Sequence, residues 1–273
     1  MALASQLILR ARDNRVLAPD LVDRRRWSHT LAFAARGRPL LAHGLADTHA
    51  HLLLACDRDE AGLHTRHLAR TLHLCLGPEL EWEPVRFSPV RDQAHLASTF
   101  GYVLGQLGHH GLDELDPFFE GTALPDLLGL RPSGAWMAGH VRRLLPRVKR
   151  EELLARFGGD PWACCERRLS TLVQAVAAAA GLPTAQGNEP LRVDARAAGI
   201  RLARQGHTIR EVADALGLSI RTVKRLSARE PSTPMLRAVE GQWAWRSQGR
   251  GQKSHPQITG GTSVPTARRS GPV

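Results

Sequence analysis

The stretch Thr208–Leu226, TIREVADALGLSIRTVKRL, carries the most specific structural signal in the chain. Thr208 and Glu211 have the Thr-x-x-Glu spacing of a capping box, which predicts that a helix begins just after Thr208. Gly217 suits the left-handed residue that ends such a helix, and Ser219 is a good N-cap for the next one. The sequence therefore predicts two short helices joined by a tight turn.

The flanking residues extend this pair to a three-helix module over residues 191–230. A preceding helix is expected over Arg192–Gln205, and Ala213 is small at the point where two helices would cross. The module resembles the helix-turn-helix units of resolvases and many bacterial regulators. The resemblance implies that the second helix of the pair enters the major groove of duplex DNA.

The outward residues of this second helix are the candidates for DNA contact. Arg221 and Thr222 lie nearest its N-terminus, where side chains reach base edges. Lys224 and Arg225 suit phosphates, and Arg210 on the helix before the turn is a further candidate. The alternative is a three-helix packing module whose basic face is merely solvated.

The composition supports a polyanionic partner. The 273 residues include 37 Lys and Arg against 26 Asp and Glu, a net charge of +11, which favours nucleic acid. Only three basic residues are Lys, so a GC-rich coding bias also fits the charge. Residues 246–273 hold five basic and no acidic residues among many Gly, Ser, Thr and Pro, and are predicted to form a disordered basic tail.

The remaining composition points to a cytoplasmic protein. The chain contains no run of about 18 apolar residues, as a membrane span requires. Its first residues hold only a short apolar stretch before charges begin, unlike a signal peptide. The four cysteines form no Cys-x-x-Cys pair, so we expect small buried residues in a reducing compartment rather than disulfides or a zinc site.

The N-terminal half predicts an α+β fold. Strands are expected within residues 6–18, 39–54 and 81–90, and helices over 19–37, 57–77 and 92–112. With two strands in the 39–54 segment, the order is β-α-β-β-α-β-α, which is close to a ferredoxin-like split β-α-β unit with an added helix. We predict a domain over residues 1–160, a helix and linker over 161–190, and then the helix-turn-helix.

Two histidines lie on the second of the paired strands. His49 and His51 are two residues apart, so on a strand both side chains point to one face, about 7 Å apart along the chain. Two imidazoles in this arrangement can hold one metal ion, and Asp47 falls on the same face as a possible orienting acceptor. The alternative is two partly buried histidines with ordinary hydrogen-bond partners.

The chain's single tyrosine lies on the last predicted helix of this domain. Tyr102 and Gln106 are four residues apart and would share a helix face. A phenol is a poor nucleophile near neutral pH, but beside a divalent ion and a polarised phosphate it can attack phosphorus. The amide oxygen of Gln106 could bind the same ion. The alternative is a core tyrosine with its hydroxyl at the edge.

Together these two motifs resemble the HUH single-tyrosine transposases, and most of all the REP-associated tyrosine transposases. The stretch DTHAHLLL resembles the Asn-His-Val-His-Leu-Leu segment of that family, and FGYVLGQLGHHGL resembles its tyrosine-helix segment. The resemblance covers residues 6–115, and more loosely extends to 160. Thr48, Ala50 and Leu107 depart from the family pattern, and none of them replaces a catalytic group.

The resemblance implies a ferredoxin-like domain that cleaves and rejoins single-stranded or hairpin DNA. His49, His51 and Gln106 would bind Mg²⁺ or Mn²⁺, and Tyr102 would form a covalent 5′-phosphotyrosine link. The family contains both homodimers and proteins that act alone, so the resemblance leaves open whether this chain forms a homodimer. The rival interpretation is a catalytically inert, helix-turn-helix regulator derived from a transposase. A histidine-metal hydrolase without a DNA role agrees less well with the charge.

Overall fold

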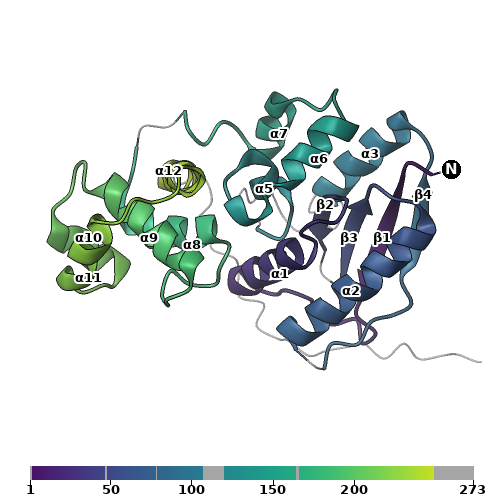
Figure 1. The fold of residues 1–273 in the computed structure, drawn as a ribbon, viewed down its shortest axis with the longest axis horizontal. Helices are drawn as coiled ribbons and strands as arrows, with labels where there is room; N and C mark the ends of the chain where they lie inside the picture. The colour runs from purple at the N-terminus through teal and green to yellow at the C-terminus, as the bar shows by residue number, and fades with distance from the viewer. Residues whose placement is uncertain (1, 47, 78, 107–119, 164–165, 249–273) are drawn as a thin grey trace, which may run out of the picture.

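The computed structural model describes residues 2–46, 48–77, 79–106, 120–163 and 166–248. The described chain forms a sheet unit, residues 2–163, and a helical unit, residues 166–248. Figure 1 shows α10 and α11 at one end of the molecule and the β-sheet at the other, with α8 and α12 between them. The fold is α+β, as the sequence predicts.

The sheet unit is built on four antiparallel strands in the order β2-β3-β1-β4. These strands are β1 (Ala4–Arg10), β2 (Leu40–Leu45), β3 (His49–Leu54) and β4 (Arg86–Val90). The central pair β1 and β3 supplies a long apolar row, Leu7, Leu9, Leu52 and Leu54, which is fully buried. Every residue of β2 and β3 is buried, so this part of the sheet is covered on both faces.

Helices cover both faces of this sheet. The helices of the sheet unit are α1 (Leu21–Ala34), α2 (Arg58–Leu76), α3 (Gln93–Leu104), α5 (Leu124–Leu128), α6 (Met137–Leu144) and α7 (Arg150–Phe157). Trp27 of α1 packs against His43, with 6.0 Å between ring centroids, so α1 and its neighbour α2 lie on the His43 face. The next residue, Gly44, faces α3. α1 and α2 thus lie on one sheet face and α3 on the other, and core residues lie on both faces.

The helical unit has its own apolar core. It comprises α8 (Leu172–Ala180), α9 (Pro190–Ala203), α10 (Ile209–Leu216), α11 (Ile220–Ser227) and α12 (Thr233–Ser247). The last helix belongs to both units, since Trp243 packs in the core of the helical unit and Trp245 packs in the core of the sheet unit. The two units are therefore joined by a shared helix as well as by the chain between them.

The order of elements up to α3 agrees with the sequence prediction, and the differences are local. The strand expected over 81–90 begins only at Arg86, because Pro84 lacks a backbone donor and leaves a single bridge at Trp82. The helix expected at the start of residues 161–190 begins only at Leu172 and ends at Ala180. Helix α12 was not predicted, and Arg246 lies in it rather than in a tail.

Two further expectations concern the cysteines and membranes. Cys56 is buried as predicted. Its burial, and to a lesser extent repulsion from Glu60 and Asp57, raises the pKa of its thiol to about 12. Cys75 is exposed, contrary to the prediction. Cys164, Cys165 and the tail from residue 249 onward lie outside the described residues. No helix in the described ranges has both the length and the apolarity to span a bilayer.

Candidate active site and DNA interface

The two histidines of β3 lie side by side on the sheet face that α3 covers. His49 pairs with Arg10 of β1, and His51 pairs with Ile8. The imidazole centroids are 4.8 Å apart, and both side chains are buried. The two rings thus lie closer together than the spacing along the strand alone indicates, which is the approach that a shared ligand requires.

Tyr102 of α3 reaches the same point from above the sheet. Its ring meets the His51 ring edge-to-face, with 5.4 Å between centroids. Leu96, Phe100 and Val103 of α3 are buried in the core of the sheet unit, and Asp92 caps the helix. Tyr102 itself is 39% exposed. The phenol is therefore fixed beside the histidines and is still accessible to a substrate.

Gln106 lies beyond the end of α3, which stops at Leu104, so the prediction that Tyr102 and Gln106 share one helix is wrong. The Gln106 side chain is fully buried, and its Nε2 donates to the Tyr102 carbonyl oxygen at 2.9 Å. Its Oε1 is buried and has no hydrogen-bond partner among the described residues. Buried polar atoms are normally satisfied, so this oxygen is suited to an external ligand.

Gly44 explains how α3 comes so close to the sheet. Gly44 pairs with His51 across β2 and β3. A Cβ at this position would collide with the Val103 carbonyl oxygen and would lie 3.2 Å from the Gln106 Cγ. Only glycine gives the last turn of α3 room to rest on β2, and this places the Gln106 side chain over the strand next to His51.

Replacing Gly44 by Ala is expected to destabilise the protein by about 1–3 kcal/mol, because the added methyl group meets backbone rather than a flexible side chain. Gly62 of α2 is the matched control, since a Cβ there meets nothing within 4 Å. Gly62→Ala should stabilise the helix by up to about 1 kcal/mol. Urea unfolding of both variants measures the difference. Equal stabilities would contradict the close approach of α3.

Sequence reasoning missed Gln6, which contacts the site from β1. Its Nε2 lies 3.2 Å from the His51 Nδ1. The amide nitrogen and oxygen exchange places by a half-turn of the side chain. With the oxygen facing His51, Gln6 accepts a hydrogen bond from Nδ1–H and leaves Nε2 of the ring as a ligand. A polar residue on β1 two positions before Ile8 was the available signal.

Positive charge flanks the histidine face. Ile8 pairs with His51 on one side and with Arg86 on the other, so Arg86 lies in the same row of the sheet. Arg10 occupies the next row, opposite His49. Arg156 of α7 lies 3.5 Å from the Gly101 carbonyl oxygen, beside Tyr102 in the chain. These guanidinium groups are placed to bind the phosphates of a DNA strand that crosses this sheet face.

The helix-turn-helix is formed as the sequence predicts. Thr208 and Glu211 complete a capping box at the start of α10, and Gly217 is left-handed with φ of 61°. Ser219 caps α11, where it accepts a hydrogen bond from the Thr222 N–H and lies 2.9 Å from the Thr222 hydroxyl. Val212, Leu216, Val223 and Leu226 point into the core. The geometry of the turn is therefore set by its caps and its apolar residues.

The predicted DNA-contacting residues lie on the outer side of this module. Arg210, Arg221, Lys224 and Arg225 are exposed, and Thr222 is half-buried against its cap. Arg196 of α9, which the sequence analysis missed, lies near Arg225 and Arg192. Burial lowers the pKa of Arg196, and the positive charges of Arg225 and Arg192 lower it further. Arg196 is itself buried and donates to the Gly187 carbonyl oxygen, and Arg192 is paired with Glu189. The exposed Arg225 is therefore the arginine of this group that is placed to bind a phosphate.

Comparison with known proteins bears on the helical unit alone. Residues 190–230 match the model of a homeodomain-like domain, a span that coincides with the predicted three-helix module. No curated protein matches the chain, and no solved structure matches it. The C-terminal helix-turn-helix is thereby supported by its sequence, its geometry and a family model, and it points to DNA binding.

Proposed function

We propose that the protein is a metal-dependent tyrosine transposase that nicks and rejoins single-stranded DNA and holds duplex DNA with its helix-turn-helix. The observation that carries the proposal is the edge-to-face contact of Tyr102 with His51, next to His49, on a sheet face with flanking arginines. The strand order β2-β3-β1-β4 supports a ferredoxin-like HUH domain, because that fold places a histidine-bearing strand at the centre of its sheet.

The residues at the site fit a divalent ion. His49, His51 and the buried Oε1 of Gln106 offer two imidazole rings and one amide oxygen. Imidazole suits Mn²⁺ better than Mg²⁺, which prefers oxygen ligands. Among the described residues no group of three His, Cys, Asp or Glu side chains is placed to hold a metal. The ion, when bound, would polarise a phosphate oxygen and offset the charge that develops on it.

The chemistry of this chain centres on Tyr102. Its hydroxyl oxygen attacks the phosphorus of a DNA backbone phosphate, and the bond from phosphorus to the 3′ oxygen breaks. The phenolic proton leaves to solvent, and the 3′ oxygen gains a proton from water. The products are a 5′-phosphotyrosine and a free 3′-hydroxyl. Because one phosphodiester replaces another, a 3′-hydroxyl can reverse the step and rejoin strands.

The direct test is covalent capture of DNA by the full chain. We expect incubation with single-stranded hairpin DNA and Mn²⁺ to give a protein–DNA band on a denaturing gel, and EDTA to abolish it. Mass spectrometry should place the nucleotide on the peptide that contains Tyr102. Absence of an adduct across a broad pool of hairpins, with duplex binding retained, would instead support an inert helix-turn-helix regulator.

Gln6 offers a separate test of the metal site. Gln6→Ala removes the group that orients the His51 ring, and loss of such an orienting partner typically lowers metal affinity about 10- to 100-fold. Mn²⁺ binding measured by calorimetry without DNA should show this change. Ser5→Ala is the control on the same strand, since Ser5 bonds the Cys56 carbonyl on the other face. Equal affinity in all three proteins would exclude Gln6 from the site.

The helix-turn-helix makes a prediction that depends on salt. Arg221→Ala should cost about 1–3 kcal/mol of duplex affinity and relax the preference for one base, whereas Lys224→Ala should weaken all sequences alike. Lys224→Ala should also reduce by about one the slope of log affinity against log salt. Fluorescence anisotropy on a selected duplex measures both. Lys149→Ala, an exposed lysine outside the module, should leave the slope unchanged.

A further inference from the structure

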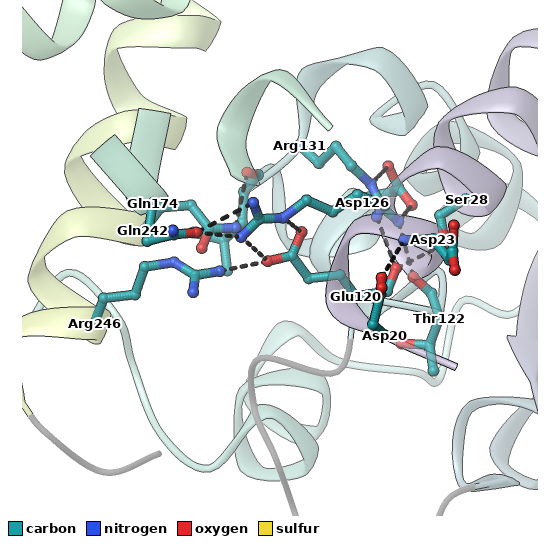
Figure 2. Close-up of polar contacts among 12 residues, drawn as sticks. Asp20, Asp23, Ser28, Glu120, Thr122, Asp126, Arg131, Gln174, Gln242 and Arg246 are labelled. Atoms are coloured by element: carbon teal, nitrogen blue, oxygen red, sulfur yellow. Dashed lines mark hydrogen bonds and ion pairs between the residues drawn. The ribbon is translucent and has the colours of Figure 1, made fainter. Parts of the chain in front are cut away.

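A buried network of charged groups lies where the helical unit meets the sheet unit. Glu120 is almost completely buried, and its two carboxylate oxygens accept from Arg25 of α1 at 2.6 and 2.9 Å. Arg246 of α12 forms an ion pair with the same carboxylate, and Gln174 of α8 accepts from Arg25 at 3.3 Å. Figure 2 shows Arg246 pointing at the Glu120 carboxylate, with Gln174 nearby. The Glu120 carboxylate thus joins α1 to α12, and Arg25 in turn joins α1 to α8.

A second group of buried polar contacts adjoins the first. Arg131 donates to the carbonyl oxygens of Glu120 and Thr122 at 3.0 and 2.8 Å, and it forms a buried ion pair with Asp126. Gln242 of α12 donates to the Leu130 carbonyl oxygen at 3.2 Å. The segment after Glu120 is therefore held both to the sheet unit and to α12, so the network is not confined to one unit.

Apolar packing closes the same junction. The Trp245 ring lies 4.9 Å from the Phe157 ring of α7, and Trp162 donates to the Arg237 carbonyl oxygen at 3.0 Å. At Gly241 an added Cβ would collide with Leu130 and Trp162, so α12 rests directly on the sheet unit. Since interiors packed in this way do not deform continuously, the junction fixes one orientation of the two units.

We infer that the protein acts on a bipartite DNA in which a duplex recognition sequence and a single-stranded cleavage site stand at one fixed spacing. This inference rests on the proposed function. The helix-turn-helix would hold the duplex, and the junction through Glu120 and α12 would hold that module at a constant offset from Tyr102. With two rigidly joined sites, simultaneous engagement succeeds only when the DNA spans the offset.

The helical geometry of duplex DNA makes cleavage depend strongly on the spacing between the two sites. Each added base pair moves the single-stranded arm about 3.4 Å along the axis and rotates it by about a tenth of a turn. Five base pairs therefore shift the arm by about 17 Å and place it on the opposite side of the duplex. A rigid protein should cut efficiently at one spacing, whereas two loosely tethered units would accept many.

The experiment uses the full chain and partial duplexes. A duplex sequence is first selected from a randomised pool with the Tyr102→Phe variant. It is then joined through 0–20 spacer base pairs to a single-stranded arm of random sequence. Adducts are counted at each spacer length with Mn²⁺, and the cleaved ends are sequenced. We expect one preferred spacing with about tenfold or more adduct over a spacing five base pairs away.

Two variants separate rigidity from catalysis. Arg246→Ala removes one member of the network at its rim, and Gln174→Ala removes a neutral one. Both should broaden the spacing profile by several base pairs, and neither residue belongs to the proposed cleavage site. A flat profile in the wild type, with adducts formed at every spacing, would overturn the fixed offset. No adduct at any spacing would count against the proposed function instead.

Discussion

Replacement of Tyr102 by Phe should abolish covalent capture of DNA, by a factor on the order of 10⁴ or more, because it deletes the attacking oxygen. The phenylalanine ring keeps the edge-to-face contact with His51, so the fold and the metal ligands should persist. The chain has only one tyrosine, so no other phenol can substitute. Quantitative denaturing gels on the hairpin pool, with Mn²⁺, measure the loss.

Two controls belong with this variant. Duplex affinity by anisotropy should match the wild type, since the helix-turn-helix lies in the other unit. Mn²⁺ affinity by calorimetry should also be unchanged within a factor of two or so, because Phe removes no proposed metal ligand. An adduct that survives Tyr102→Phe would assign the nucleophile to another residue and would reject the mechanism proposed here.

Glu120→Gln should reduce the free energy of unfolding by about 3–5 kcal/mol, because it leaves Arg25 and Arg246 buried beside a neutral amide. The exposed pair of Arg12 and Glu81 is the matched control, with both side chains 66% accessible. Glu81→Gln should cost no more than about 1 kcal/mol. Urea unfolding with linear extrapolation compares the two. Similar losses of unfolding free energy in the two variants would show that Arg25 and Arg246 do not depend on the Glu120 charge for their stability in the interior.

The acid dependence of stability follows from the same carboxylate. Burial alone would raise the pKa of Glu120, but the charges of Arg25 and Arg246 and the hydrogen bonds from Arg25 hold the pKa below the ordinary value of 4.5. A lowered folded-state pKa gives stability that is present above pH 4.5 and is lost as the pH falls through the folded value. The wild type should therefore lose stability below pH 4.5 more steeply than Glu120→Gln.

The elements that could be predicted are those with one apolar face and clear end signals. The capping box at Thr208, the left-handed Gly217 and the period-two histidines of β3 are local features, and each is found where the sequence indicates. Helix α12 could not be predicted in this way. Its buried residues serve two cores, with Trp243 in one and Trp245 in the other, so it lacks the single apolar stripe that identifies a surface helix.

The site could be predicted in part for a similar reason. The spacing of His49 and His51 and the single Tyr102 are visible in the sequence, but their approach depends on Gly44, whose role appears only when β2 and α3 are packed. The Glu120 network could not be inferred, because charged residues are normally exposed and nothing local marks Arg25 as buried. Contacts between residues about a hundred positions apart produce no periodic pattern in the sequence.

The position of α12 has a consequence for synthesis on the ribosome. Domains generally fold from the N-terminus as they emerge, but here the sheet unit waits for a helix encoded after the helix-turn-helix. Until α12 leaves the exit tunnel, Phe157 lacks its Trp245 partner and Glu120 lacks Arg246. The nascent chain should therefore expose an incomplete apolar surface for the whole translation of residues 164–247, and this makes it a client for chaperones that bind such surfaces.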